Sequence, residues 1–471
     1  MLIKNSQKID FDNFDFVITG SGPAGISLAL RLEEAGKKIL IIEAGNLEVS
    51  KESQDLYSGE VIGDKYFNLD EARLRCFGGS SGHWGGNCFE LDDTDFKNWP
   101  IKKTDLLKYK NKAKEILNLK GDFDKKKSYF EDFEEISFLQ SDVRFGDKYL
   151  EHIKNSRNIF LILNTPLLKI IPYSMSTNEI EKIVVLLENK YFKEIKIKKL
   201  ILCSGGIENS RLLLWSKISS NSNFLQELPI GHYWSDHPTG DAAQFILNKE
   251  LNKKYENLEN IQISPSKEYL IKNNLNNCRF NFKKIKNNNK DFKKYIKDFV
   301  CLAPNLGKKL LENSIGSKSI HCFGAIKFST EQEGIYENKI TLDNFKDKLG
   351  IPRTKINWNI KDNVFQTLIK TLENLGNQFI EKNIGRIGID KTIYDNNFKK
   401  INDVYGNHHH IGGTIMGKNK KSSVVDSNLK IHSLKNLYVA GSSVFSSAGH
   451  ANPTYTIVML SLRLGDHLLE I

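Results

Sequence analysis

Several features that define other classes of protein are missing from this 471-residue chain. No apolar run approaches the roughly 18 residues of a membrane-spanning helix, so none is predicted. The polar residues 1–12 lack the apolar core of a secretory signal, which favours a cytoplasmic location. The six cysteines form no Cys-x-x-Cys pair and no regular framework, so reduced thiols are expected. A Cys-x-x-Cys-His motif for haem attachment is absent as well.

The charge balance does not indicate a nucleic-acid-binding protein. The chain carries 68 Lys and Arg against 57 Asp and Glu, a net charge of +11. Its basic residues are scattered rather than gathered with aromatics into a stripe, and no recognition motif accompanies them. A composition rich in Lys, Asn and Ile produces the same excess of positive charge. The length of 471 residues suggests two or three structural units, and the 39% of hydrophobic residues is typical of a globular protein.

The beginning of the chain carries a dinucleotide-binding pattern. A buried strand is predicted at 14–19, a helix at 26–35 and a second strand at 38–42, which ends at Glu43. The glycine-rich loop before the helix permits a tight turn and lets backbone amides approach a pyrophosphate. Glu43 follows the loop at about the 20-residue spacing of a carboxylate that binds ribose hydroxyls. The expected cofactor contacts in the loop are Gly20, Gly22, Pro23, Ala24 and Gly25.

Only one such pattern occurs, and this bears on the identity of the cofactor. An enzyme that uses both a flavin and a nicotinamide often has a second glycine motif in mid-chain. Glu43 also disfavours a 2′-phosphate, which would need an arginine. FAD alone is therefore predicted.

A second glycine-rich loop covers residues 78–88. Ordering glycine is costly in conformational entropy, so a cluster of glycines indicates backbone pressed against a flat or anionic group. Arginines just before the loop can meet phosphates. A flexible loop without a ligand is the alternative, but the first motif favours cofactor contact. The residues expected to make it are Arg75, Gly79, Ser80, His83, Trp84, Gly85, Gly86 and Asn87.

The C-terminal part of the chain places histidines, a strand and a helix in close succession. His408, His409 and His410 come first, residues 436–440 form a hydrophobic strand, and a helix is predicted at 454–469. Three adjacent histidines could bind a metal, but neighbours on a strand point to opposite faces. No carboxylate or cysteine cluster lies at ligand spacing, so no metal site is expected.

Together these motifs resemble those of the glucose–methanol–choline (GMC) oxidoreductases. The C-terminal stretch is most similar to the bacterial sugar and sugar-acid dehydrogenases of that family. The likeness keeps the family's order over nearly the full length. The stretches that carry it are 20–25 with Glu43, 78–86, 98–101, 203–213, 236–238 and 409–467.

The resemblance implies an α/β fold with a discontinuous, Rossmann-like FAD-binding domain at 1–240 and 405–471. A substrate-binding domain, built on an antiparallel sheet with helices, is implied at 241–404. The residue pattern agrees with this outline. Further elements expected from it are strands at 158–170, 183–203 and 319–328, a helix at 363–382 and an exposed polar stretch at 284–294.

Oxidation of an alcohol by hydride transfer needs a base for the hydroxyl proton, and a neutral imidazole near pH 7 suits that task. In the family this base is a His before a Gly-Thr-x-x-Met-Gly type ending. Counting back from Met416 selects His409, whereas aligning the Gly-Thr pair on 413–414 selects His410. We favour His409 as the base, and His410 is the alternative that the second alignment selects.

The family's second active-site residue, a His or Asn before the last helix, matches Asn452. Its amide can donate to the substrate oxygen or to the flavin edge. Pro453 suits the first helical turn, and the helix N-terminus would stabilise an anionic reduced flavin. Some relatives bind FAD covalently through a His in the glycine loop. His83 has that spacing, and whether it forms such a bond is left open. Other expected cofactor contacts are Leu167, Gly205, Arg211, Gly441, Ser442, Asn452, Pro453 and Thr454.

The predicted function is FAD-dependent oxidation of a hydroxyl group on a sugar, polyol or related alcohol. A dehydrogenase is favoured over an oxidase, and the electron acceptor (oxygen, a quinone or a redox protein) is left open. Two alternatives remain: a lyase of the same fold that keeps FAD in a structural role, and a non-catalytic flavoprotein.

Overall fold

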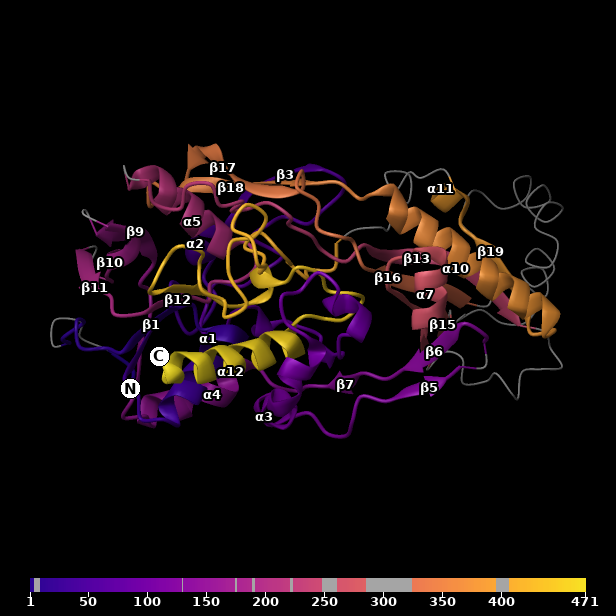
Figure 1. Ribbon diagram of the computed structural model, residues 1–471, viewed down its shortest axis with the longest axis horizontal. Coiled ribbons are helices and arrows are strands. Elements are labelled where there is room, and N and C mark those ends of the chain that lie inside the picture. The colour runs from indigo at the N-terminus through magenta and orange to yellow at the C-terminus, as the bar shows by residue number, and fades with distance from the viewer. Residues whose placement is uncertain are drawn as a thin grey trace.

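The computed structural model describes all residues except 4–8, 129, 174–175, 189–190, 221–222, 248–260, 285–323 and 395–405. Most of the predicted polar stretch 284–294 and the first part of the predicted strand 319–328 therefore lie outside the described residues. Figure 1 shows an elongated molecule with a different sheet toward each end. We call the part around the parallel sheet, which contains the predicted glycine loops, the cofactor side. The part around the antiparallel sheet is called the substrate side.

A five-stranded parallel sheet forms the core of the cofactor side, with strand order β20-β12-β1-β2-β8. Each strand is a short, buried and largely apolar run, as expected where both faces of a parallel sheet are covered. The predicted strand–loop–helix–strand unit is present as β1, α1 and β2. The strands are β1 (Phe16–Thr19), β2 (Ile39–Ile42), β8 (Ile159–Ile162), β12 (Leu200–Leu202) and β20 (Leu437–Val439).

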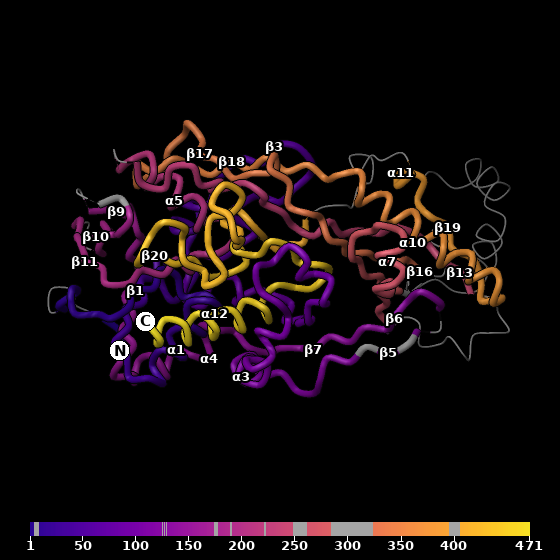
Figure 2. The backbone as a smooth tube through the Cα atoms, in the orientation of Figure 1, coloured from indigo at the N-terminus to yellow at the C-terminus, as the bar shows by residue number. Residues whose placement is uncertain are grey.

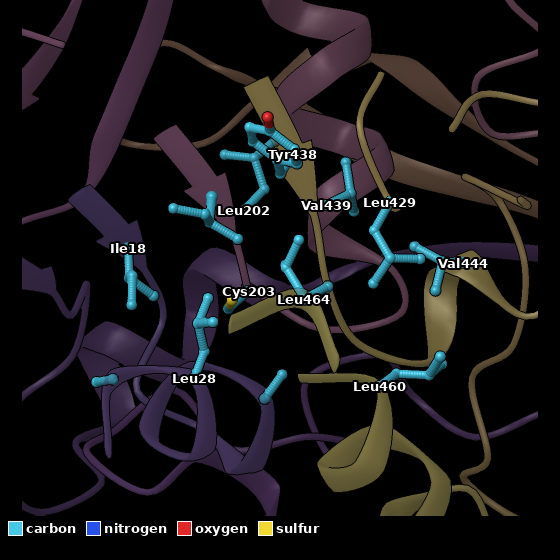
Figure 3. Close-up of a cluster of buried hydrophobic side chains, with 14 of the residues drawn as sticks. Ile18, Leu28, Leu202, Cys203, Leu429, Tyr438, Val439, Val444, Leu460 and Leu464 are labelled. Atoms are coloured by element: carbon cyan, nitrogen blue, oxygen red, sulfur yellow. The ribbon is translucent and has the colours of Figure 1, made fainter. Parts of the chain in front are cut away.

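Two helices, α1 (Pro23–Glu33) and α12 (Thr454–Glu470), lie side by side against this sheet. Their contact is close, because a Cβ on Gly465 would stand 2.6 Å from the Arg31 side chain. Arg31 Nε also donates to Asp466 at 2.7 Å. Figure 3 shows Leu28 and Leu464 from these helices beside strand residues such as Leu202. The C-terminal helix thus completes the core that the N-terminal motif begins.

A seven-stranded sheet, in which all pairs are antiparallel, forms the substrate side, with strand order β19-β13-β16-β15-β14-β6-β5. The helix α10 (Asp362–Glu381) packs Leu368, Leu372 and Phe379 into one core cluster with the sheet residues Phe280 and Phe328. The strands are β5 (Lys125–Lys127), β6 (Phe133–Ile136), β13 (Thr239–Leu247), β14 (Gln262–Pro265), β15 (Cys278–Lys284), β16 (Gly324–Thr330) and β19 (Gly385–Ile389). The predicted α/β class with a second, antiparallel sheet is confirmed.

The chain crosses between the two sides more often than the predicted boundaries imply. β5 and β6 belong to the predicted FAD segment 1–240, yet they extend the substrate-side sheet. In Figure 2, β6 lies at the same end of the molecule as β13 and β16, far from β1. Conversely, β18 (Pro352–Trp358) from the segment 241–404 pairs in parallel with β3 (Gly59–Gly63). The domain boundaries themselves stay a prediction.

Several predicted elements occur with different ends. The strand expected at 158–170 divides into β8 and β9, and the one expected at 183–203 contains the end of β10 and the whole of β11 and β12. The remaining strands are β4 (Asn87–Cys88), β7 (Leu139–Gln140), β9 (Leu167–Tyr173), β10 (Ser176–Leu186), β11 (Phe192–Lys196) and β17 (Lys339–Lys346). The other helices are α2 (Lys51–Gln54), η2 (Asp55–Tyr57), η3 (Gly79–Gly82), η4 (Asp93–Phe96), η5 (Lys103–Tyr109), α3 (Lys110–Ile116), α4 (Phe145–Asn155), α5 (Glu208–Ser219), α7 (Lys267–Asn273), α11 (Lys391–Tyr394) and η9 (Ser442–Val444).

Candidate active site

A cavity of about 510 Å³ lies where the carboxyl ends of β1 and β12 meet the C-terminal segment and β15. This is the edge at which open α/β sheets bind ligands. Every predicted site residue except Gly25 lines it. Those residues are Gly20, Gly22, Pro23, Ala24, Glu43, Arg75, Gly79, Ser80, His83, Trp84, Gly85, Gly86, Asn87, Leu167, Gly205, Arg211, His409, His410, Gly441, Ser442, Asn452, Pro453 and Thr454.

The first glycine loop has the geometry of a phosphate cradle. Gly20 has a φ of 95°, and a Cβ there would stand 2.5 Å from the carbonyl oxygen of Cys203. A Cβ on Gly22 would meet nothing within 4 Å, so the loop leaves open space before the first turn of α1. Gly25 does not face the cavity: its Cβ would collide with the Gly20 oxygen at 2.1 Å. Gly25 therefore serves the close packing of helix on strand, and the rest of the loop fits a pyrophosphate.

The second glycine loop packs directly on the first. The amide of Gly78 donates to the carbonyl oxygen of Ser21 at 3.1 Å, and a Cβ on Gly79 would lie 3.3 Å from Gly22 Cα. Glu43 is buried and accepts from the amides of Ser21 at 3.0 Å and Gly45 at 2.8 Å. The Glu43 carboxylate therefore holds the first glycine loop in place and also lines the cavity.

The arginines near the cavity are tied to the protein. Arg73 pairs with Glu208 at 3.2 Å, and Arg211 pairs with Glu208 at 2.8 Å and with Asp347. Arg211 donates further to the carbonyl oxygens of Pro352 and Ile351, so all its guanidinium nitrogens have protein acceptors. Its expected contact with the cofactor stays a prediction, but these hydrogen bonds to the protein indicate a supporting role.

Arg75 has a similar environment. Its Nη1 donates to Ala44 O at 2.9 Å and to Ser53 Oγ at 2.8 Å. Ser443, next to the cavity-lining Ser442, turns inward: its hydroxyl accepts from Asn209 at 3.0 Å and it does not line the cavity. The Ser442 hydroxyl donates to the carbonyl oxygen of His410 and thus holds the histidine segment.

A short antiparallel pairing brings the histidine segment against residues 235–237. Ser235 and Ile411 exchange backbone hydrogen bonds at 2.8 and 2.9 Å, and this register sets His237 opposite His409. The buried Asp236 carboxylate accepts from the amides of His237, His409 and residue 407 and from the hydroxyl of Tyr66. Burial raises the pKa of Asp236 to about 6, although these hydrogen bonds act in the opposite direction.

The facing imidazoles of His237 and His409 are hydrogen-bonded through their Nδ1 atoms at 2.8 Å. Burial, followed by the charge of Arg279, lowers the pKa of His237 to about 3. Burial, then His237 and Arg279, holds the pKa of His409 well below its usual value. Both rings are therefore neutral at pH 7, and one of the two Nδ1 atoms must donate while the other accepts.

His410 also lines the cavity, but its side chain has different neighbours from that of His409. Its ring is stacked near Trp234, with centroids 6.3 Å apart, and its Nε2 is buried without a hydrogen-bond partner. Burial and the charge of Arg73 lower its pKa to about 3. The charge of Arg279, which lies beside Asn452, contributes to the low pKa of His409, whereas the charge of Arg73 contributes to that of His410.

Asn452 and Arg279 meet across the two sides of the molecule. Arg279 projects from β15, and its Nη2 donates to Asn452 Oδ1 at 3.1 Å. Since a guanidinium has only donors, this contact orients the amide: Oδ1 faces Arg279, and the two Nδ2 hydrogens are directed elsewhere. His409, Asn452 and Arg279 all line the same cavity.

Sequence reasoning missed two of these residues. His237 lay within the Asp-His-Pro stretch that was noted without a role, and its pairing with His409 depends on a register between distant segments. Arg279 lies in a Lys- and Asn-rich region where no local pattern distinguishes it from other basic residues. In the part of the chain that the structure describes, no three His, Cys, Asp or Glu side chains are grouped as a metal site requires.

Glycine loops on a parallel sheet and a helix N-terminus open to a cavity are typical of a dinucleotide-binding site, and here a neutral imidazole and an oriented amide line the same cavity. A family model described as GMC oxidoreductase matches residues 336–461. Residues 336–461 thus match the C-terminal domain of the GMC oxidoreductases, the family that the motifs resemble.

Two curated relatives are dehydrogenases. The chain is 25% identical to the fructose dehydrogenase large subunit of Gluconobacter japonicus over 64% of its own length and 54% of the relative. It is 31% identical to 2-methyl-1,2-propanediol dehydrogenase of Mycolicibacterium austroafricanum over 28% of its length and 22% of the relative. The chain thus spans about half or less of the curated relatives it matches.

Solved structures share the fold over almost the whole chain. Pyridoxine 4-oxidase from Mesorbium loti superposes with a TM-score of 0.63 at 14% identity, covering 98% of this chain and 100% of that one. A variant of formate oxidase from Aspergillus oryzae RIB40 superposes with a TM-score of 0.58 at 15% identity, covering 97% and 98%. Among the described residues, no helix has both the length and the apolar surface needed to cross a bilayer.

Proposed function

We propose that this protein oxidises the CH–OH group of a sugar, polyol or related alcohol with FAD, and that His409 is the base. The observation that carries the proposal is the meeting of a neutral His409, an oriented Asn452 and two glycine loops at one cavity. The glycine loops fit the pyrophosphate of FAD, with open space at Gly22 before the N-terminus of α1.

The chain's own residues suit the proton chemistry. His409 Nε2 takes the hydroxyl proton of the substrate, and Asn452 Nδ2 donates a hydrogen bond to the same oxygen. Bound FAD supplies the acceptor for the hydride that leaves the carbinol carbon, and a carbonyl product remains. The low pKa of His409 keeps the imidazole neutral before the reaction, so that one of its ring nitrogens is free to accept a proton.

His237 acts in this scheme as a positioning residue. If His409 Nδ1 carries the hydrogen and donates to His237 Nδ1, the lone pair of His409 Nε2 is free for the substrate. The opposite assignment would place the hydrogen on His409 Nε2 and remove the base. The proposal therefore requires the first arrangement.

Anaerobic mixing of the FAD-loaded protein with a panel of sugars and polyols tests the function. At least one of them should bleach the flavin absorbance. His409→Ala should slow that bleaching about 10²- to 10⁴-fold, the usual contribution of a general base, with its FAD content unchanged. His410→Ala is the matched variant and should have a smaller effect; the reverse order would assign the base to His410. If no alcohol bleaches the flavin, a lyase or a non-catalytic flavoprotein is favoured.

We also propose that His83, which lines the cavity and is exposed, is the residue through which a covalent bond to FAD would form. A denaturing gel examined for flavin fluorescence after acid treatment tests this bond. A fluorescent band in the wild type that disappears in His83→Ala is the expected sign of the bond, and a non-fluorescent wild-type band contradicts it.

A further inference from the structure

Arg279 brings a positive charge into the cavity from the substrate side. The side chain leaves β15 in the middle of the seven-stranded sheet, and its guanidinium lies over the ring of Phe89, with Cζ 4.1 Å from the ring centroid. It lines the cavity together with His409 and Asn452. The charge therefore lies beside the groups that the proposed reaction uses.

This charge lacks a counterion within the described residues. Nη2 donates to the neutral Asn452, whereas the buried Nη1 has no hydrogen-bond partner. No Asp or Glu of the described chain lies within ion-pair distance of Arg279, and burial alone lowers its pKa, to about 10. The nearby imidazoles of His237 and His409 are neutral and cannot balance it.

Two buried arginines of the cavity, Arg73 and Arg211, are paired with carboxylates. Arg73 and Arg211 share the carboxylate of Glu208, and Arg211 has a second one in Asp347. A buried charge without a partner is costly, and the planar guanidinium matches a carboxylate with two parallel hydrogen bonds. Arg279 thus has a free donor and an unbalanced charge at the place where a substrate must bind.

We propose that Arg279 binds a carboxylate of the substrate, so that the site oxidises hydroxy acids in preference to the matched neutral alcohols. The inference rests on the proposed alcohol oxidation and names its substrate class. Because Arg279 contacts Asn452 directly, the carboxylate and the reacting hydroxyl must be only a few bonds apart. An anionic reduced flavin is the other source of negative charge that this guanidinium could face.

Binding of a carboxylate that cannot be oxidised tests the site without turnover. The FAD-loaded, oxidised protein is titrated with propionate and with its neutral analogue propanamide, and flavin difference absorbance is recorded. We expect propionate to bind roughly 30- to 100-fold more tightly, the size of one or two charge-assisted hydrogen bonds. Arg279→Gln should abolish the difference, and Arg279→Lys should retain part of it. Equal binding of the two ligands, or no effect of Arg279→Gln, overturns the proposal.

Anaerobic flavin reduction with matched substrates tests the consequence for turnover. D-glycerate is compared with glycerol and D-gluconate with D-glucitol; the acids should reduce the flavin with roughly 30- to 100-fold higher efficiency, and Arg279→Gln should collapse that ratio. If Arg279→Gln shifts only the flavin reduction potential and leaves propionate binding unchanged, the guanidinium stabilises the reduced flavin, and the proposal of a carboxylate site is overturned. If propionate binds through Arg279 but no alcohol or hydroxy acid reduces the flavin, the oxidation proposal fails while the anion site stands.

Discussion

The two sides of the molecule contribute to the same cavity in different ways. On the cofactor side, backbone atoms of glycine loops and a helix N-terminus form the walls. On the substrate side, a broad antiparallel sheet supports one charged side chain, Arg279, at the cavity. A site formed by backbone atoms requires particular residue types at several neighbouring positions, so it appears in the sequence as a motif. A site formed by one side chain on a sheet requires a particular residue at a single position.

The largest effect is expected from a glycine on the cofactor side. Gly20→Ala should nearly abolish FAD binding, because the new Cβ would stand 2.5 Å from the Cys203 oxygen at a φ of 95°. Gly36→Ala is the matched control, since Gly36 also has a positive φ, 70°, but open space around it. It should cost about 1 kcal/mol of stability and leave flavin content unchanged. FAD titration of both purified variants measures this, and full binding by Gly20→Ala would contradict the assigned role of the loop.

A core substitution on the substrate side should instead separate stability from cofactor binding. Leu368→Ala, at a fully buried position of α10, should lower the free energy of unfolding by about 2–5 kcal/mol. The folded variant should still bind FAD. Ile380→Ala on the same helix, where the side chain is 65% exposed, should change stability by less than about 0.5 kcal/mol. Urea unfolding with flavin titration tests both, and loss of FAD by folded Leu368→Ala would show that the sides are not separable.

His237 lies where the two sides meet, and a smaller, kinetic effect is expected there. His237→Leu should lower the rate of flavin reduction roughly 10- to 100-fold, as removal of a residue that orients a ligand or base does. His237→Gln should recover much of that rate, because its amide oxygen can accept from His409 Nδ1. Stopped-flow reduction of both variants measures the effect, with 15N shifts of His409 to report its tautomer. Equal rates in Leu and Gln variants would remove the positioning role.

The most gradual effect is a pH dependence of stability. A buried His with a pKa of about 3 stays neutral when folded, but the unfolded chain takes up a proton below about pH 6.5. The free energy of unfolding therefore falls as pH drops, by about 1.4 kcal/mol per pH unit for His410. Buried carboxyls such as Asp236, with a raised pKa, act in the opposite direction. The free energy of unfolding of the wild type and of His410→Gln is measured from pH 6.5 to 4.5, and the difference between the two slopes isolates the contribution of the imidazole. Equal slopes would contradict the low pKa assigned to His410.

The sequence predicted the parallel core, the glycine loops and the α10 helix, because these depend on local periodicity and on backbone conformations that only certain residues adopt. It placed all but one of the expected residues at the cavity. It could not reveal that Gly25 faces the strand rather than the cavity, nor that Arg211 is already saturated by protein acceptors. Pairings such as His237 with His409 depend on a register between segments far apart in the chain, which no local pattern contains.

The position of the C-terminal segment has a consequence for the order of events during synthesis. β20 is the edge strand of the parallel sheet, α12 lies against α1, and both follow the histidine segment in the chain. A nascent chain that has emerged only as far as β12 already has both glycine loops, but neither His409 nor Asn452. Such a chain could hold the cofactor without a base or an oriented amide beside it. On the proposed function, capture of the flavin can therefore precede catalytic competence, which requires the most distant segment of the chain to dock.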